Sequence, residues 1–309
     1  MNKQHRVMVA GGTGLVGSAL VRRLHAGGYA NVLAPTRQTL DVADAAAVRA
    51  YLQQHQPDVL FIAAAKVGGI QANNTHRADF LLDNLRIQTS LIGGAHEAGI
   101  QRLMFLGSSC IYPRMAVQPI TEDALLTGPL EPTNEPYAVA KIAGIKLCEA
   151  MAHQHGRAYV SVMPTNLYGP GDHYDLATSH VLPALIRKVH EAKQRGEAAV
   201  PVWGTGTPRR EFLFVDDLAD ACVYLMEQAY AGPLLNIGTG EDISICELTE
   251  LVMSVVGHTG HLQFDTSQPD GTPRKLLDVS RLTALGWQAR TSMREGIALA
   301  YADYLARFG

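Results

Sequence analysis

The stretch VMVAGGTGLVGSAL, residues Val7 to Leu20, decides the fold of this chain. It starts as an apolar run and passes through Gly11-x-x-Gly14-x-x-Gly17 into residues with helical periodicity. Glycines at a strand-to-helix turn let the backbone approach a pyrophosphate, whose charge meets the amino-terminal end of the helix. A glycine triplet alone is weak evidence. At the first strand-to-helix turn, however, it predicts a dinucleotide site rather than an ordinary glycine-rich turn.

Short apolar runs alternate with longer helical patterns through the first half of the chain. This alternation predicts an α/β fold with a doubly wound, parallel Rossmann sheet. The predicted strands are Val7 to Ala10, Val32 to Ala34, Val59 to Ala65, Leu103 to Leu106 and Tyr159 to Met163, and the predicted helices are Leu15 to Gly27, Ala43 to His55, Arg77 to Gly99 and Tyr137 to His155.

The second half begins with a Gly/Pro/His-rich stretch, Tyr168 to His180, and is less regular. We interpret the apolar runs Phe212 to Val215 and Leu234 to Ile237 as returns of the chain to the main sheet. The expected domains are a cofactor-binding Rossmann domain over residues 1–167, with a returning segment at about 211–240, and a smaller lobe, mainly substrate-binding, over 168–309.

The composition fits a globular protein that does not bind polyanions. The 309 residues are 47% hydrophobic and 18% charged, which allows a large core. The net charge is -3 and the Lys and Arg residues are scattered, which argues against nucleic acid as a partner. No segment approaches the ~20 apolar residues of a membrane span, and the first residues lack the pattern of a signal peptide. The four cysteines are too far apart for Cys-x-x-Cys spacing, so we expect no metal site and a cytoplasmic location.

The residues after the second predicted strand predict the type of cofactor. NAD-preferring proteins usually place an acidic residue there, which binds the ribose 2′-hydroxyl. This chain has Arg37 instead, and an arginine presents a planar donor array that suits the 2′-phosphate of NADP(H). A solvated surface arginine is the alternative. Asp41 is expected either beside the adenine or as the cap of the following helix.

The cofactor site should extend along the edge of the sheet, because ligands of such folds bind at the carboxyl ends of the strands. Asn166 is expected to face the nicotinamide end, with stabilisation of its own turn as the alternative. The expected cofactor-binding residues are Gly11, Gly12, Thr13, Gly14, Leu15, Val16, Gly17, Arg37, Asp41, Leu106, Gly107, Ser108, Ser109, Lys141, Pro164, Thr165, Asn166, Leu167 and His180.

Tyr137 and Lys141 lie four residues apart, so on a helix they share one face. We expect the ammonium to lower the pKa of the phenol from about 10, which would let Tyr137 exchange a proton with a carbonyl or alcohol near neutral pH. The spacing is common by chance, but here it follows the fourth predicted strand of a sheet that begins with a glycine turn. That strand ends near Ser108, whose hydroxyl could hydrogen-bond the reacting carbonyl oxygen.

Together, a serine, Tyr137 and Lys141 resemble the short-chain dehydrogenase/reductase superfamily in its extended, nucleotide-sugar branch. Longer motifs resemble the GDP-L-fucose synthase family over essentially the whole chain. These motifs are AAAKVGGIQANN (Ala63 to Asn74), GSSCIYP (Gly107 to Pro113), EPTNEPYA (Glu131 to Ala138), PTNLYGP (Pro164 to Pro170) and DGTPRKLLD (Asp270 to Asp278).

The resemblance implies a bifunctional enzyme. Its substrate would be GDP-4-keto-6-deoxy-D-mannose, epimerised at C3 and C5 and then reduced at the C4 ketone with NADPH to give GDP-L-fucose. It implies that Ser108, Tyr137 and Lys141 form the reductase triad and that Cys110 and His180 form the acid/base pair for epimerisation. It also suggests a homodimer, formed through the Arg77 to Gly99 and Tyr137 to His155 helices.

The chemistry gives separate reasons for a thiol and an imidazole. A moderately strong base can remove protons alpha to a ketone, and a partly ionised Cys110 and a His180 near its own pKa suit such proton transfers. We expect Cys110 to be more accessible and more easily ionised than the other cysteines. Which of the two is the base stays open, and a buried packing cysteine and a surface histidine are the alternatives.

The second half also carries side chains that suit a GDP-sugar. Cations would hold the diphosphate, an aromatic face would stack on the base, and a carboxylate would bind a polar edge. By resemblance the expected substrate-binding residues are Lys188, Trp203, Arg210, Asp270 and Lys275, although surface lysines are common without such a role.

Two other functions compete with this hypothesis. One is a nucleotide-sugar 4,6-dehydratase or 4-epimerase, but dehydratases of this branch typically carry a glutamate where Cys110 stands. The other is a non-catalytic NADP-sensing protein, which would typically have lost the tyrosine or the lysine. Both residues are present here.

Overall fold

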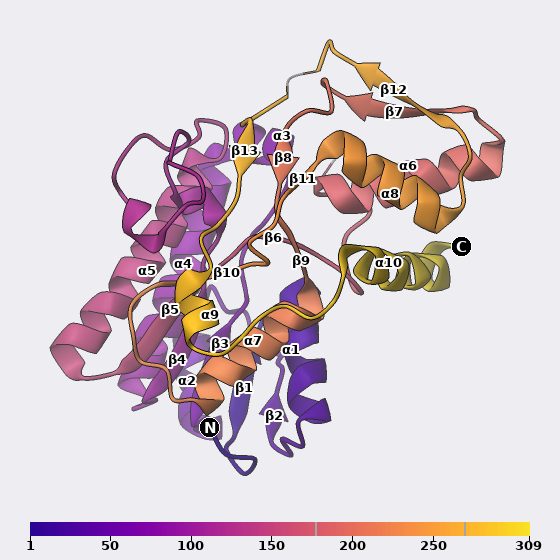
Figure 1. The fold of residues 1–309 in the computed structure, drawn as a ribbon. Coiled ribbons are helices and arrows are strands. Elements are labelled where there is room, and N and C mark those ends of the chain that lie inside the picture. Colours follow the sequence, from indigo (N-terminus) through magenta and orange to yellow (C-terminus); the bar gives the residue numbers. More distant parts are fainter. Residues whose placement is uncertain (177, 269) are drawn as a thin grey trace.

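A six-stranded parallel sheet forms the centre of the molecule (Figure 1). The computed structural model describes residues 1–176, 178–268 and 270–309, so the predicted irregular stretch Tyr168 to His180 includes one residue, 177, outside the described residues. The strand order is β10-β5-β4-β3-β1-β2. The strands are β1 (Val7–Ala10), β2 (Val32–Leu33), β3 (Val59–Ile62), β4 (Arg102–Leu106), β5 (Ala158–Pro164) and β10 (Leu235–Ile237).

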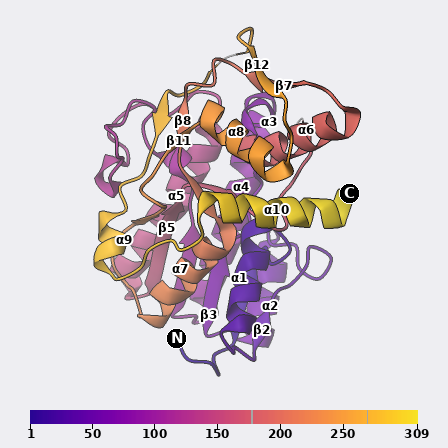
Figure 2. The same ribbon diagram turned by 45° about the vertical axis from the view of Figure 1, so that its right-hand side comes forward.

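Helices cover both faces of this sheet, which explains why its strands are continuous apolar runs rather than alternating ones. In β1, Val7 and Val9 pack toward α1 and α7, whereas Met8 packs toward α2, α4 and α5. Figure 2 shows α1 and α7 on the near face. The covering helices are α1 (Leu15–Ala26), α2 (Ala45–His55), α4 (Arg77–Glu97), α5 (Glu135–His155) and α7 (Val215–Glu227). The predicted α/β class and doubly wound parallel sheet are confirmed.

A smaller lobe has its own apolar core, formed by side chains such as Ile186, Val252 and Ile297. It contains α6 (Val181–Arg195), α8 (Ile245–Val256) and α10 (Met293–Phe308), with β7 (Ala199–Trp203) paired in parallel with β12 (His261–Asp265). A small sheet, β8 (Arg209–Arg210), β11 (Ile243–Ser244) and β13 (Arg274–Lys275), lies between this lobe and the main sheet (Figure 1). The remaining helices are α3 (Ile70–Thr75), α9 (Ser280–Ala284) and the short 3-10 turns η1 (Ser109–Ile111) and η2 (Glu122–Ala124).

One prediction about local structure is wrong, and one of two alternatives is excluded. The run Phe212 to Val215 does not return to the main sheet: among the described residues, β9 (Phe212–Phe214) pairs with β6 (Asn166–Tyr168) alone. The later run does return, as β10. Asp41 does not cap the following helix either. Asp44 takes that position and accepts hydrogen bonds from the first amides of α2, while Asp41 accepts one from the amide of Ala43 in the preceding turn.

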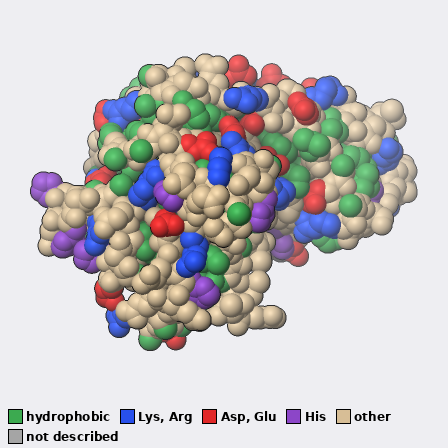
Figure 3. All heavy atoms as spheres, turned by 90° about the horizontal axis from the view of Figure 1, so that it is seen from below, with side chains coloured by type: hydrophobic (Ala, Val, Ile, Leu, Met, Phe, Trp, Pro, Cys, Tyr) green, Lys and Arg blue, Asp and Glu red, His purple; other side chains and the backbone are tan. Residues whose placement is uncertain are grey.

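The surface agrees with the scattered charge of the sequence. On the face seen in Figure 3, acidic and basic side chains are mixed. Within the described ranges, every helix is too short or too polar to cross a bilayer.

Candidate active site

The glycine turn lies at the carboxyl edge of the sheet, where strand order reverses between β1 and β3. Gly11 has φ +87°, and a Cβ added there would lie 2.7 Å from the backbone nitrogen of Ala64, just after β3. A Cβ at Gly17 would lie 1.9 Å from the carbonyl oxygen of Gly11, so α1 packs directly against the turn. Gly14 caps α1 without a side chain, which leaves the first helical amides available to an anion. The turn therefore fits a dinucleotide pyrophosphate.

Arg37 lies exposed after β2, beside a cluster of charges. Among the described residues its guanidinium donates no hydrogen bond. The neighbouring carboxylate, Asp83 on α4, binds the ammonium of Lys66 at 2.7 Å. This hydrogen bond holds the pKa of Asp83 below its usual value, and the charges of Arg86 and Arg37 act in the same direction. Three cations thus surround one carboxylate at the position where a 2′-phosphate is expected.

The expected reductase triad comes together where β4 ends and α5 begins. Ser108 follows β4, and Tyr137 and Lys141 lie in the first two turns of α5. Lys141 is buried, and its ammonium donates a 2.8 Å hydrogen bond to the carbonyl oxygen of Leu106 at the end of β4. The same ammonium lies 5.8 Å from the ring centroid of Tyr137. Ser108 caps η1 and interacts with the Tyr137 hydroxyl.

The expected lowering of the Tyr137 pKa is not what the structure gives. Burial raises the pKa of the Tyr137 phenol, with the nearby Cys110 acting in the same direction and a hydrogen bond with Ser108 opposing it. Burial also lowers the pKa of Lys141 to about 8. Desolvation disfavours the charged form of each group and is the largest influence on both pKa values. A phenol that keeps its proton at neutral pH suits a proton donor.

Cys110 lies in η1, two residues after Ser108, and is 7% exposed. We expected an accessible, partly ionised thiol, but burial raises the pKa of Cys110. The charges of Lys275 and Lys141 and a hydrogen bond from Ser108 oppose this. Cys246 is more exposed than the other three cysteines, which are all buried.

The two fully buried cysteines lack this cationic surrounding. Burial raises the pKa of Cys148 to about 12 and raises that of Cys222 as well, and no cation acts on either thiol within the described residues. Cys110 is therefore distinguished by neighbouring cations and not by exposure.

His180 precedes α6 as its N-cap and is exposed. Its imidazole makes no capping hydrogen bond. Desolvation by the surrounding protein lowers the pKa of the His180 imidazole, and the charge of His173 lowers it further. The amide of Gly69 donates a 3.0 Å hydrogen bond to the carbonyl oxygen of Thr178, which ties the loop before His180 to the segment after β3.

The remaining expected cofactor residues follow β4 and β5. A Cβ at Gly107 would lie 1.9 Å from the terminal methyl of Met163, so packing requires glycine there. Thr165 and Asn166 both donate hydrogen bonds to the carbonyl oxygen of Glu211, at 3.1 and 2.8 Å. The Asn166 side-chain amide thus joins β6 to the residue before β9 rather than stabilising its own turn.

The expected substrate-binding residues divide into two groups. Lys188 and Trp203 meet in the small lobe, with the ammonium 4.8 Å from the ring centroid and the indole 58% exposed. The carboxylate of Asp270 binds the amide and hydroxyl of Thr205, at 2.7 and 2.9 Å. Arg210 and Lys275 face each other instead in the pairing of β8 with β13, where Lys275 lies close to Cys110.

Two buried polar residues, Glu211 and Asn236, were not singled out from the sequence. They join the chain around β8 and β10 to the chain that follows β13. The Glu211 carboxylate, fully buried, accepts from the amides of Thr239, Gly240 and Leu277 at 2.7–3.0 Å. Asn236, also fully buried, lies in β10. Each could have been noticed as a polar residue within or beside an apolar run.

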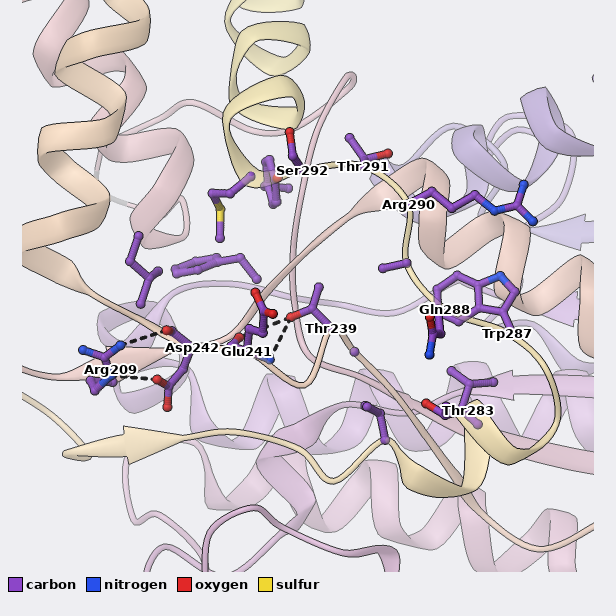
Figure 4. Close-up of a pocket in the computed structure, with 18 of the residues that line it drawn as sticks. Arg209, Thr239, Glu241, Asp242, Thr283, Trp287, Gln288, Arg290, Thr291 and Ser292 are labelled. Carbon is purple, nitrogen blue, oxygen red and sulfur yellow. Dashed lines mark hydrogen bonds and ion pairs between the residues drawn. The ribbon is translucent and has the colours of Figure 1, made fainter.

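A cavity of about 770 Å³ is lined by none of the expected site residues. It is bounded by the loop after β10, by α9 and by the chain that enters α10, and Arg209 pairs with Asp242 across its rim (Figure 4). The labelled side chains include Glu241, Trp287 and Arg290.

The parallel sheet, its glycine turn and the Tyr/Lys helix define a dinucleotide-dependent enzyme of the epimerase and dehydrogenase type. The family model described as NAD dependent epimerase/dehydratase matches residues 7–238. The chain is 54% identical to GDP-L-fucose synthase 1 of Arabidopsis thaliana over 98% of its length and 94% of that protein. It is 51% identical to the GDP-L-fucose synthase of Escherichia coli (strain K12), over 99% and 98% of the two chains.

The solved structure of an NADP-bound GDP-L-fucose synthetase from Naegleria fowleri matches with a TM-score of 0.90 and 27% identity, over 100% of this chain and 95% of the other. The chain belongs to the NAD dependent epimerase/dehydratase family and, within it, to the GDP-L-fucose synthase family.

Proposed function

We propose that this chain converts GDP-4-keto-6-deoxy-D-mannose to GDP-L-fucose, by epimerisation at C3 and C5 and NADPH-dependent reduction of the C4 ketone. The observation that carries the proposal is identity of 51–54% to GDP-L-fucose synthases over nearly the whole chain. The thiol of Cys110 beside the Ser108–Tyr137–Lys141 group supports it, because reduction alone does not need a thiol.

The glycine turn would hold the cofactor pyrophosphate, and Arg37 its 2′-phosphate. NADPH supplies, when bound, the hydride that reduces C4. Lys141 fits the cofactor end of this site because its ammonium is fixed at the carboxyl end of β4 by the carbonyl oxygen of Leu106. The residues after β4 and β5 would complete the site.

For the reduction, Tyr137 would donate its phenolic proton to the C4 oxygen. The raised pKa of the phenol keeps it protonated until the oxygen develops negative charge. The ammonium of Lys141 would stabilise the phenolate that remains, and the Ser108 hydroxyl would hydrogen-bond the substrate oxygen.

For the epimerisation, Cys110 and His180 would exchange protons at the carbons on either side of the ketone. Inversion requires removal of a proton from one face of the sugar and delivery of another to the opposite face. The two residues come from different segments, η1 and the end of the loop before α6, which is compatible with groups on two sides of one ring. In the same complex, Lys188, Trp203, Arg210 and Asp270 would serve the GDP end.

The direct test is incubation of the purified protein with NADPH and GDP-4-keto-6-deoxymannose. We expect loss of NADPH absorbance in step with the appearance of GDP-L-fucose, identified by NMR. A product reduced at C4 but not inverted at C3 and C5 would refute the epimerase half. Inversion without NADPH consumption would refute the reductase half.

We further propose a cytoplasmic homodimer. The helices α4 and α5 pack side by side and carry exposed apolar side chains, among them Leu82 at 48% and Val139 at 43% exposure. A bundle with the same two helices of a second copy would cover them. Sedimentation of the wild type and of a Leu82→Arg/Val139→Arg variant tests this, and a wild-type monomer would refute it.

A further inference from the structure

The loop that follows Cys110 and the chain that follows Lys275 are joined by backbone hydrogen bonds at Ile120, although they are far apart in the sequence. The amide of Ile120 donates to the carbonyl oxygen of Leu276 at 2.8 Å, and the amide of Asp278 donates to the carbonyl oxygen of Ile120 at 2.9 Å. The side-chain oxygen of Gln118 accepts from the amide of Leu276 at 2.8 Å. Gln118 and Ile120, in the loop after η1, therefore lie beside the residues that directly follow Lys275.

Asn236 joins both segments to the main sheet. Its side-chain oxygen accepts from the hydroxyl of Tyr112, two residues after Cys110, at 2.6 Å. Its side-chain nitrogen donates to the carbonyl oxygens of Ile120 and Asp278, at 2.9 and 3.1 Å. Because Asn236 is fully buried, these bonds are shielded from water and fix the two segments relative to each other.

The edge of β13 that faces β8 is also hydrogen-bonded. Lys275 lies opposite Arg210 in the β8–β13 pairing, and its carbonyl oxygen accepts a 3.3 Å hydrogen bond from the amide of Glu211. The Glu211 carboxylate accepts from the amide of Leu277 at 3.0 Å. The chain at Lys275 and Leu276 is thus hydrogen-bonded on both edges, to β8 on one side and to the loop at Gln118 on the other.

The charges around Cys110 come from several elements. Lys275 on β13 and Lys141 on α5 both favour its thiolate, and Ser108 adds a hydrogen bond. Tyr137 on α5 also interacts with the thiol. The other charged groups that act on Lys275 are Arg210 on β8 and Glu131 in the loop before α5.

From this arrangement we propose that Lys275 is a positioning residue for the epimerisation, which stabilises the Cys110 thiolate instead of serving only as a cation for the diphosphate. The inference rests on the proposed function, because it gives the Cys110 thiolate a proton-transfer role. Both lysines favour the thiolate, but Lys141 is held by the carbonyl oxygen of Leu106 and has the Tyr137 phenolate to stabilise in the reduction, whereas Lys275 has no such second role at the thiol. Lys188, stacked over Trp203, remains available for the diphosphate.

The test compares Lys275→Met, Lys275→Arg and Lys188→Met with the wild type. The first readout is the ultraviolet absorbance of the thiolate against pH in the free protein, taken as the difference between each variant and the same variant with Cys110→Ala. The second is deuterium uptake by the keto-sugar, separated into KM and kcat. Thermal unfolding checks that each variant is folded.

We expect Lys275→Met to move the Cys110 titration to higher pH, with roughly tenfold less thiolate at neutral pH and a similar loss in kcat for deuterium uptake. Lys275→Arg keeps the charge and should largely restore both. Lys188→Met should raise KM and leave the titration in place.

An unchanged titration in Lys275→Met, with an effect on KM alone, would overturn the inference and assign Lys275 to the diphosphate. Equal changes in Lys275→Met and Lys275→Arg would also overturn it, because charge would then not be the cause. The titration needs no substrate, so it can fail while the protein still makes GDP-L-fucose. Failure of the proposed function would appear instead as absence of that product from the wild type.

Discussion

The pair proposed for reduction and the pair proposed for epimerisation are built in different ways. Tyr137 and Lys141 lie on one helix, α5, and their spacing of four residues sets their relative position before any tertiary contact forms. Cys110 and His180 come from a 3-10 turn and from the residue before α6, far apart in the sequence, so only the tertiary structure sets their relative position.

The difference shows in how each pair is supported. One hydrogen bond to Leu106 fixes Lys141. The neighbourhood of Cys110, in contrast, depends on Asn236 and Glu211, two buried polar residues that bind several segments at once. Reduction should therefore respond mainly to changes in α5, and epimerisation to changes across the molecule.

The largest expected effect separates the two half-reactions. Tyr137→Phe should lower NADPH oxidation by roughly 10²-fold or more, the scale for loss of a positioned acid. Deuterium uptake by the keto-sugar should persist, because it does not use the phenol. Absorbance measures the oxidation of NADPH, and mass spectrometry measures the deuterium in the recovered keto-sugar. Loss of deuterium uptake together with oxidation would show that the pairs are not separate.

Cys110→Ser should act in the opposite way. A serine hydroxyl ionises far too weakly to replace a thiolate, so deuterium uptake should fall by about 10²-fold, and formation of GDP-L-fucose with it. Cys246→Ser is the matched control, since that thiol lies in the small lobe and should be dispensable. Undiminished deuterium uptake in Cys110→Ser would show that the thiol does not take part in the epimerisation.

A smaller effect is expected at the cofactor. Arg37→Ala should weaken NADPH binding by about 1.5–3 kcal/mol, as for a hydrogen bond to a charged group, and leave NADH binding little changed. Fluorescence titration with both cofactors measures this. Equal weakening of both would mean that Arg37 does not bind the 2′-phosphate.

The smallest effect concerns the cost of burying Lys141. Its pKa is lowered to about 8 in the folded protein, so between about pH 8 and the unfolded value the unfolded chain binds more protons and stability rises with pH. Relative to Lys141→Met, the wild type should gain on the order of 1–2 kcal/mol between pH 7.5 and about 9.5. Urea unfolding at both pH values measures the difference. A constant difference would show that Lys141 keeps its charge throughout.

Sequence patterns predicted the sheet lobe well because its signals are local. The inner strands β1 and β3 are buried on both faces and read as apolar runs. Helices α1, α2, α4 and α5 end within a few residues of their predicted limits. The run at Phe212 had the same appearance but pairs with β6, because pairing is decided by which strand lies beside it. Roles of individual site residues stay predictions until the variants are measured.

The sequence by itself determined the glycine turn, the one-face placement of Tyr137 and Lys141, and the family, since each rests on spacing along the chain. Only the tertiary structure decided the environment of Cys110. Its burial, the approach of Lys275 and the bonds of Asn236 join residues more than a hundred positions apart. Desolvation and long-range charge depend on which segments meet in space, and residue spacing carries no record of them.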